Sequence, residues 1–317
     1  MKLFLKLPYF ALFAFSFFMV SCVSTKQPSF INYKESYCTP PDYIKYHDEK
    51  ITSNPDSVLV AWSSLKNDYS EQNILIANAL GITQELNEMK SLKADFSESA
   101  RIRKMEIRQK INNRIVKAQS EINSVSAELD CEGERLDQIA KYVDDENSSK
   151  MTKLTVASIV LGTASAVAGV FIKNDNWNNG VTIGAGALGA GLGFAMLNPK
   201  GVKTELMHQR NLLRAIWEDK NTNHSFPSFV WYMLNERHFS NLGDYSLIHN
   251  VRERWINYQF GGDEKSAKKS VIFSTGGAYL AADLHARSQM IKQMQAVVRS
   301  LNQNLDFLIT EIDKNEG

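Results

Sequence analysis

The sequence predicts a mainly α-helical protein with long antiparallel coiled-coil helices, a glycine-rich apolar helical hairpin and a small aromatic-rich helical head. Apolar residues recur every seven positions in two long stretches, which is the spacing of a coiled-coil seam. Residues 154–199 hold two charged side chains where the average of the chain predicts about ten, and three of the five tryptophans lie between residues 217 and 255. We expect six segments: an export signal at 1–21, a tether at 22–56, a long helical coiled coil at 57–150, the hairpin at 151–200, the head at 201–280 and a C-terminal coiled-coil helix at 281–317.

Residues 1–21 have the pattern of an export signal, because Lys2 and Lys6 precede an apolar run from Tyr9 to Val20. The run closes on Met19-Val20-Ser21-Cys22, which resembles the lipobox of bacterial lipoproteins. The resemblance implies cleavage before Cys22 and attachment of lipid to that cysteine, and two or more acyl chains anchor a protein stably. An ordinary secretory signal and an uncleaved anchor helix are the alternatives.

The residue after the lipobox bears on location. Val23 follows the lipobox cysteine directly, at the position where an aspartate would resemble the inner-membrane retention signal of some bacteria. We therefore expect an outer-membrane lipoprotein of the cell envelope, with its periplasmic or surface side left open. The mature chain is close to neutral, which gives no support to nucleic-acid binding.

The tether and the remaining cysteines belong together. Four of the seven prolines lie between Pro28 and Pro55, so residues 22–56 are expected to be irregular. With Cys22 assigned to lipid, Cys38 and Cys131 remain as an even number in an oxidising compartment. We predict a disulfide between them; two unpaired thiols are the alternative.

Residues 57–150 carry two seven-residue series. The first is Leu75, Ile82, Met89 and Phe96, and the second is Ile115, Ile122, Leu129, Leu136 and Val143, interleaved with Ile111, Ala118, Val125 and Ile139. Because the series are out of phase by one residue, a continuous long helix must unwind locally between them. A break near residues 97–102, with Ser97 or Asp95 capping a new helix, is the alternative.

Basic residues gather around this slip. Arg101, Arg103, Lys104, Arg108, Lys110, Arg114 and Lys117 face only Glu106 along the same stretch. We interpret them as the solvated face of a coiled coil that pairs with an acidic neighbour. Contact with anionic lipid or nucleic acid is the alternative for such a stretch.

The apolar segment reads as two helical arms. Leu154 to Ile172 and Val181 to Leu197 carry no charge and are about 28 and 26 Å long as helices, close to a hydrocarbon core of roughly 30 Å. Small residues at four-residue spacing would let the arms approach closely. They are Ser158, Gly162 and Ala166 on the first arm and Ala185, Gly189 and Gly193 on the second. The second arm resembles the glycine-zipper segments of certain outer-membrane lipoproteins.

Lysines bracket this hairpin and bear on how it is used. Lys150, Lys153, Lys200 and Lys203 would lie on the non-cytoplasmic side of an exported protein, against the positive-inside tendency. Ordinary inner-membrane insertion is therefore disfavoured. Insertion after export and burial within protein remain as the two expectations.

The head is expected to contain helices at Thr204–Asp219 and Ser246–Phe260, a loop at Gly261-Gly262 and a short strand or hairpin edge at Val271–Phe273. In the C-terminal helix, Ile291, Val298, Leu305 and Ile312 alternate with Met294, Leu301 and Leu308 in an uninterrupted seam. This seam must be covered, so the helix is expected to pack along residues 70–147, in either direction, within one chain or across an oligomer.

No catalytic chemistry is predicted. The six histidines lack metal-ligand spacing, His208 and His285 are expected on helices, and Ser274-Thr-Gly-Gly277 reads as a turn. We expect a lipid-anchored envelope scaffold without a cofactor, whose partners are the membrane and proteins or copies of itself, including a homo-oligomer, but no nucleic acid. The architecture also resembles cytolysin A-type α-helical pore-forming toxins, a likeness that implies a hairpin released into a target membrane.

Overall fold

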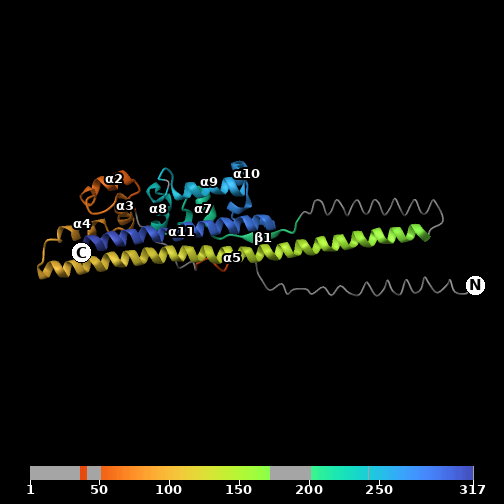
Figure 1. Ribbon diagram of the computed structural model, residues 1–317, viewed down its shortest axis with the longest axis horizontal. Coiled ribbons are helices and arrows are strands. Elements are labelled where there is room, and N and C mark those ends of the chain that lie inside the picture. The colour runs from red at the N-terminus through yellow and green to blue at the C-terminus, as the bar shows by residue number, and fades with distance from the viewer. Residues whose placement is uncertain (1–35, 41–50, 172–200, 242, 317) are drawn as a thin grey trace, which may run out of the picture. The chain divides into compact units, whose positions relative to one another are not determined.

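The computed structural model describes residues 36–40, 51–171, 201–241 and 243–316 (Figure 1). The described chain is mainly helical, as predicted. Every contact below lies within residues 34–317. The export signal, Cys22 and the second hairpin arm with Ala185, Gly189 and Gly193 lie outside the described residues.

The first part of the expected long helix is divided into short ones, so that prediction is wrong. α2 (Pro55–Ala61), the 3-10 turn η1 (Ser63–Leu65), α3 (Glu71–Leu80) and α4 (Thr83–Ser91) follow one another. α3 ends because Gly81 takes a left-handed conformation (φ 67°), a geometry that glycine adopts without steric cost. Leu75, Ile82 and Met89 are buried as expected, but in separate elements.

The long helix α5 (Glu98–Phe171) begins at a capped break. The Ser97 hydroxyl accepts a hydrogen bond from the Ala100 amide, and Asp95 accepts one from the Ser97 amide. Phe96, which closed the first apolar series, is 84% exposed. The out-of-phase series are therefore resolved by a new helix and not by unwinding of a continuous one.

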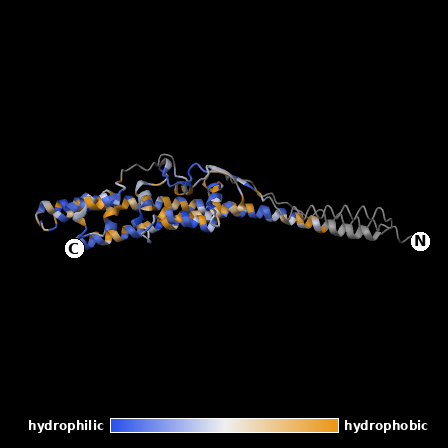
Figure 2. Cartoon of the chain, turned by 90° about the horizontal axis from the view of Figure 1, so that it is seen from above, coloured by the Kyte–Doolittle hydropathy of each residue, from blue (hydrophilic) through white to orange (hydrophobic). Residues whose placement is uncertain are grey.

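α11 (Ala281–Glu316) packs along α5 in the opposite direction. His285 contacts Asp144, Lys292 pairs with Asp137, and Arg299 donates to Ser126, so partners on α5 fall as positions on α11 rise. All seven members of the C-terminal apolar series are buried. Figure 2 shows hydrophobic residues gathered where the helices face one another. Burial of each such side chain stabilises the folded protein by roughly 1.5–3 kcal/mol.

α5 does not end where the hairpin was expected to start. It continues through residue 150 to Phe171, so the boundary between residues 150 and 151 falls inside one helix. Within the described ranges, no helix contains a stretch long and apolar enough to cross a membrane.

The head, predicted to be mainly helical with a short strand or hairpin edge at residues 271–273, contains a two-stranded sheet whose strands lie elsewhere. β1 (Thr204–Met207) pairs antiparallel with β2 (Gly276–Tyr279) in the register Thr204 to Tyr279 and Met207 to Gly276. Its other elements are α7 (Leu212–Glu218), η2 (Thr222–His224), α8 (Ser228–Asn235), η3 (Arg237–Phe239), α9 (Leu247–Gln259), α10 (Glu264–Lys268) and η4 (Val271–Phe273).

Two local predictions for the head change with this sheet. The helix expected from Thr204 begins only at Leu212, after β1, and the strand expected at 271–273 is the 3-10 turn η4. Aromatic packing forms the centre of the head, where Trp217 stacks on Phe273 with ring centroids 4.5 Å apart and Trp255 is fully buried. The helix predicted at Ser246–Phe260 is confirmed as α9.

Candidate functional site

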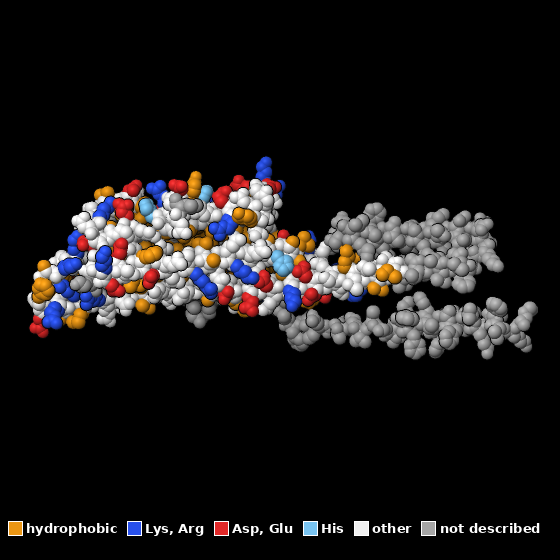
Figure 3. Space-filling model, viewed as in Figure 1, with side chains coloured by type: hydrophobic (Ala, Val, Ile, Leu, Met, Phe, Trp, Pro, Cys, Tyr) orange, Lys and Arg blue, Asp and Glu red, His pale blue; other side chains and the backbone are white. Residues whose placement is uncertain are grey.

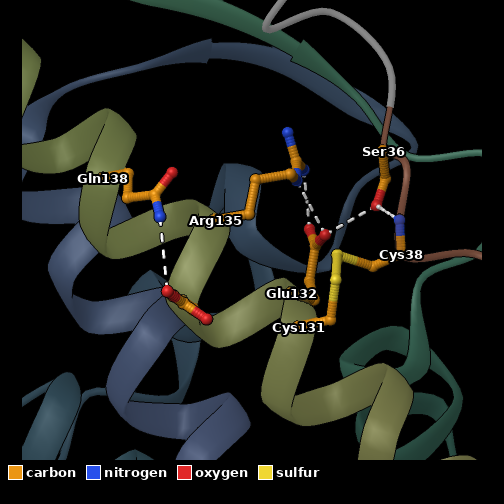
Figure 4. The surroundings of a disulfide bond; sticks show 7 residues. Ser36, Cys38, Cys131, Glu132, Arg135 and Gln138 are labelled. Atoms are coloured by element: carbon orange, nitrogen blue, oxygen red, sulfur yellow. Dashed lines mark hydrogen bonds and ion pairs between the residues drawn. A yellow bond between two sulfur atoms is a disulfide. The ribbon is translucent and has the colours of Figure 1, made fainter.

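The two body cysteines lie at disulfide-bonding distance, with Cα atoms 5.6 Å apart (Figure 4). The pair fixes the segment 36–40 against the middle of α5. Ser36 adds to this attachment, because its hydroxyl donates to Glu132 at 2.8 Å and accepts from the Cys38 amide at 3.2 Å. We call the group Ser36, Cys38, Cys131, Glu132 and Arg135 the latch.

Glu132 is the polar centre of the latch. Arg135, one turn along α5, donates its Nε to Oε2 at 2.8 Å and its Nη2 to Oε1 at 2.7 Å. This bidentate geometry is the strong form of a charge-assisted hydrogen bond. The same carboxylate binds Ser36. By fixing the orientation of Glu132, Arg135 therefore also helps to hold the segment 36–40 in place.

A second charged pair joins α5 to the head. Glu128 lies one turn before Glu132, and its Oε1 is 3.2 Å from Nε of Arg210 in the segment between β1 and α7. Burial raises the pKa of Glu128 to about 7; Arg210 opposes this shift and the nearby Glu132 adds to it. Glu128 therefore titrates near neutral pH.

Arg287 of α11 completes the polar cluster. Its residue exposure is 2%, and Nη1 donates to the Asn211 side chain at 3.2 Å and to the Ile272 carbonyl at 2.5 Å. Its Nε has no hydrogen-bond partner among the described residues. Burying a guanidinium beside mainly neutral acceptors is costly, which marks this position as one that apolar packing alone does not explain.

His208 belongs to the same cluster but carries no charge. Its Nε2 lies 2.8 Å from the Tyr279 hydroxyl, which donates to the Val271 carbonyl at 2.8 Å. Burial, with the positive charges of Arg287 and Arg135, lowers the pKa of His208 to about 2. The ring is neutral at physiological pH and serves to link β1 to β2.

The cavity at this cluster is small. It is lined by Glu128, Glu132, His208, Arg210 and Arg287 and has a volume of about 20 Å³, which holds about one water. In the part of the chain that the structure describes, no three His, Cys, Asp or Glu side chains are placed to bind a metal ion. The geometry suits mechanical attachment of three chain segments.

The structure brings some of the sequence-predicted residues together and not others. It brings Cys38 and Cys131 together, and it places Ser158, Gly162 and Ala166 on α5, where the Ser158 hydroxyl donates to the Thr155 carbonyl. Contact between the two hairpin arms stays a prediction. His285 lies on helix α11 as expected, whereas His208 follows a strand.

Sequence reasoning missed Glu128, Glu132, Arg210 and Arg287. A signal existed for two of them. Glu132 fills the gap between Val125 and Ile139 in a seven-residue series, and Arg287 precedes Met294 by seven residues. A charged residue at an otherwise apolar seam position is the pattern that points to such a site.

No family model, curated protein or solved structure matches this chain.

Proposed function

We propose that the protein is a lipid-anchored envelope scaffold or interaction protein, attached to the outer membrane through Cys22 and without a catalytic role or cofactor. The latch is the observation that carries this proposal. Cys22 and Cys38 are 16 residues apart. A fully extended chain spans at most about 3.6 Å per residue, so the connecting segment can reach no farther than roughly 58 Å from the lipid to the middle of α5. Force on the anchor would reach α5 through the disulfide and Glu132 together.

The two long helices provide the scaffold. We infer that α5 and α11 form an antiparallel coiled coil, because their seven-residue apolar series are buried against each other. α5 has 74 residues and is about 110 Å long, far longer than α11 with 36 residues. Proteins or further copies of the chain are the partners that such helices bind.

The hairpin supplies a second contact in this proposal. Val156 and Ile159 on α5 are more than half exposed, near the start of the charge-free stretch from Leu154. Exposed apolar residues on a projecting helix support insertion into a membrane or burial in a partner protein. Both uses are compatible with an anchor at Cys22.

Membrane fractionation with carbonate extraction tests the topology. Wild type is expected in the membrane pellet, and Cys22→Ala is expected to stay there if the hairpin is a second anchor. Release of Cys22→Ala into the soluble fraction would contradict constitutive anchoring by the hairpin. Cys38→Ser is the matched control, because it also removes a cysteine but keeps the lipid site.

A membrane-perturbing or pore-forming protein is the second candidate, and the exposed Val156 and Ile159 are the observation that favours it. Here the hairpin would leave a protected state and enter a target membrane. Dye leakage from liposomes that disappears on deletion of residues 154–197 would favour this function. Co-purification with an envelope complex, without leakage, would favour the scaffold.

A further inference from the structure

A second and larger cavity lies between α4, the first turns of α5, the segment before α3 and the end of α11, next to the turn that joins α4 to α5. Four of its described lining residues are basic and one is acidic. The lining residues are Asp68, Tyr69, Met89, Lys90, Lys93, Lys104, Arg108 and Asn315. Its volume of about 80 Å³ exceeds the space one water needs several-fold, whereas the cavity at the latch holds about one. A polyatomic anion therefore has room here.

Part of the surrounding positive charge is already used within the fold. Arg103 donates Nε and Nη2 to Glu88 at 2.6 and 2.9 Å, and Lys110 pairs with Glu85. These pairs agree with the interpretation that the basic stretch faces an acidic neighbour, which is α4. Lys90 likewise contacts Asp68 at 2.6 Å.

Other cations are left for an external anion. No salt bridge among the described residues involves Lys93, Arg101 or Lys104, although the charge of Lys104 also acts on the nearby Asp95 carboxylate. Lys104 donates to the Asp95 carbonyl at 2.9 Å and lies 5.8 Å from the centroid of the Phe96 ring. This contact holds a positive charge next to an exposed aromatic ring.

Large apolar side chains surround the same turn. Phe96 is 84% exposed, and Ile102 and Met105 are each about half exposed or more. Figure 3 shows hydrophobic and basic side chains gathered together at this end of the molecule, and Figure 1 places it at the opposite end of α5 from Phe171. We call Lys93, Phe96, Arg101, Ile102, Lys104, Met105 and Arg108 the elbow.

We propose that the elbow binds an anionic lipid bilayer, with a headgroup phosphate at the cavity between Lys93, Lys104 and Arg108. Phe96, Ile102 and Met105 would enter the interfacial layer. Cations alone would suit any polyanion, but exposed aromatic and aliphatic side chains gain nothing from a nucleic-acid backbone and gain burial at a bilayer surface. This chemistry does not depend on the lipid at Cys22 or on the hairpin.

Vesicle co-sedimentation of the Cys22→Ala chain tests this contact without the acyl anchor. Vesicles of 30% phosphatidylglycerol in phosphatidylcholine are compared with pure phosphatidylcholine. The chain is expected to bind the anionic vesicles at least 10-fold more tightly. Lys93→Glu with Lys104→Glu is expected to remove that preference, and Phe96→Ser to weaken binding 3-fold or more.

Matched variants on the head separate a specific effect from a general one. Lys265→Glu with Lys269→Glu makes the same charge change, and Tyr258→Ser removes another exposed aromatic ring. These controls are expected to bind anionic vesicles like the parent chain, and thermal unfolding should show all variants folded. Equal losses in the controls, or no preference for anionic vesicles, would overturn the proposal.

Two further arms identify the source of the anion. Inorganic phosphate at constant ionic strength is expected to leave vesicle binding within 2-fold; full displacement by phosphate would overturn the lipid assignment in favour of a free-anion site. Retention of double-stranded DNA by the parent chain without vesicle binding would also overturn it.

Discussion

Glu132 on α5 and Arg287 on α11 line one cavity; Glu132 interrupts the seven-residue apolar series of its helix, and Arg287 lies one repeat before Met294, where the series of its own helix begins. At this level the apolar contact between the two helices gives way to charged groups. Those groups hold the segment 36–40 through Ser36 and the head through Asn211. The interruption is thus the place where the attached segment, the helix pair and the head meet.

Breaking the disulfide should destabilise the body. Cys131→Ser removes a link that closes a loop of 93 residues, and the chain-entropy model predicts a loss of roughly 4–5 kcal/mol in the free energy of unfolding. Urea unfolding measures it. Reduced wild type is the control and should match the variant, whereas an unchanged midpoint in both would show that the disulfide does not stabilise the fold.

Glu128 should make stability fall as pH rises towards neutrality. Its pKa is about 7 in the folded protein against 4.5 for the unperturbed group. Folding therefore favours the protonated form, so this contribution is complete below pH 4.5 and is lost as pH rises through about 7. It amounts to roughly 1–3 kcal/mol.

Urea unfolding of Glu128→Gln and wild type at pH 5 and pH 8 measures this contribution. The variant should lack that part of the slope, while Glu134→Gln, at an exposed position on the same helix, should keep it. Parallel profiles for wild type and Glu128→Gln would be the contradictory result.

Gly276→Ala should disrupt the sheet of the head. An added Cβ would lie 2.5 Å from the Leu206 carbonyl oxygen and 2.9 Å from the Met207 Cα, at a φ of 139°. We expect the free energy of unfolding to fall by more than about 2 kcal/mol. Gly262→Ala is the matched control, since its φ is also positive (84°) but its surroundings are open, and it should cost about 1 kcal/mol. Thermal unfolding that ranks the two in the opposite order would refute the β1–β2 pairing.

Leu301→Ala tests the pairing of α5 and α11. Leu301 is fully buried, so truncation should cost about 2–5 kcal/mol in urea unfolding. Phe307→Ala on the same helix removes an exposed ring and should change the free energy by under about 0.5 kcal/mol. Comparable costs for the two substitutions would mean that Leu301 does not face α5.

The C-terminal helix could be predicted because its seven-residue series lies on one uninterrupted helix. The series from Leu75 to Phe96 had the same spacing, but it crosses the helix end at Gly81 and stops just before the Ser97 cap that begins a new helix. Short helices that pack on one surface can keep a seven-residue spacing by chance, so the pattern does not distinguish them from one long helix. The alternative of a break near Ser97 was the correct one.

The sheet and the charged cluster were harder to predict for a different reason. β1 and β2 have four residues each, which gives too few alternations to distinguish strand from helix, and their partners are about 70 residues apart. The cysteine pairing followed from counting. Glu128 and Arg210 come from separate segments and carry no local signal, so only the tertiary structure brings them together.

In the proposed arrangement Cys22 carries the lipid anchor, and the latch connects the anchored segment to the helical body. Mass spectrometry of the N-terminal peptide of the purified mature protein tests this arrangement most directly. We predict a chain that begins at Cys22 with acyl groups on that residue, and loss of the modification in Cys22→Ala. A mature chain that retains Met1, or one that has an unmodified Cys22, would contradict the account.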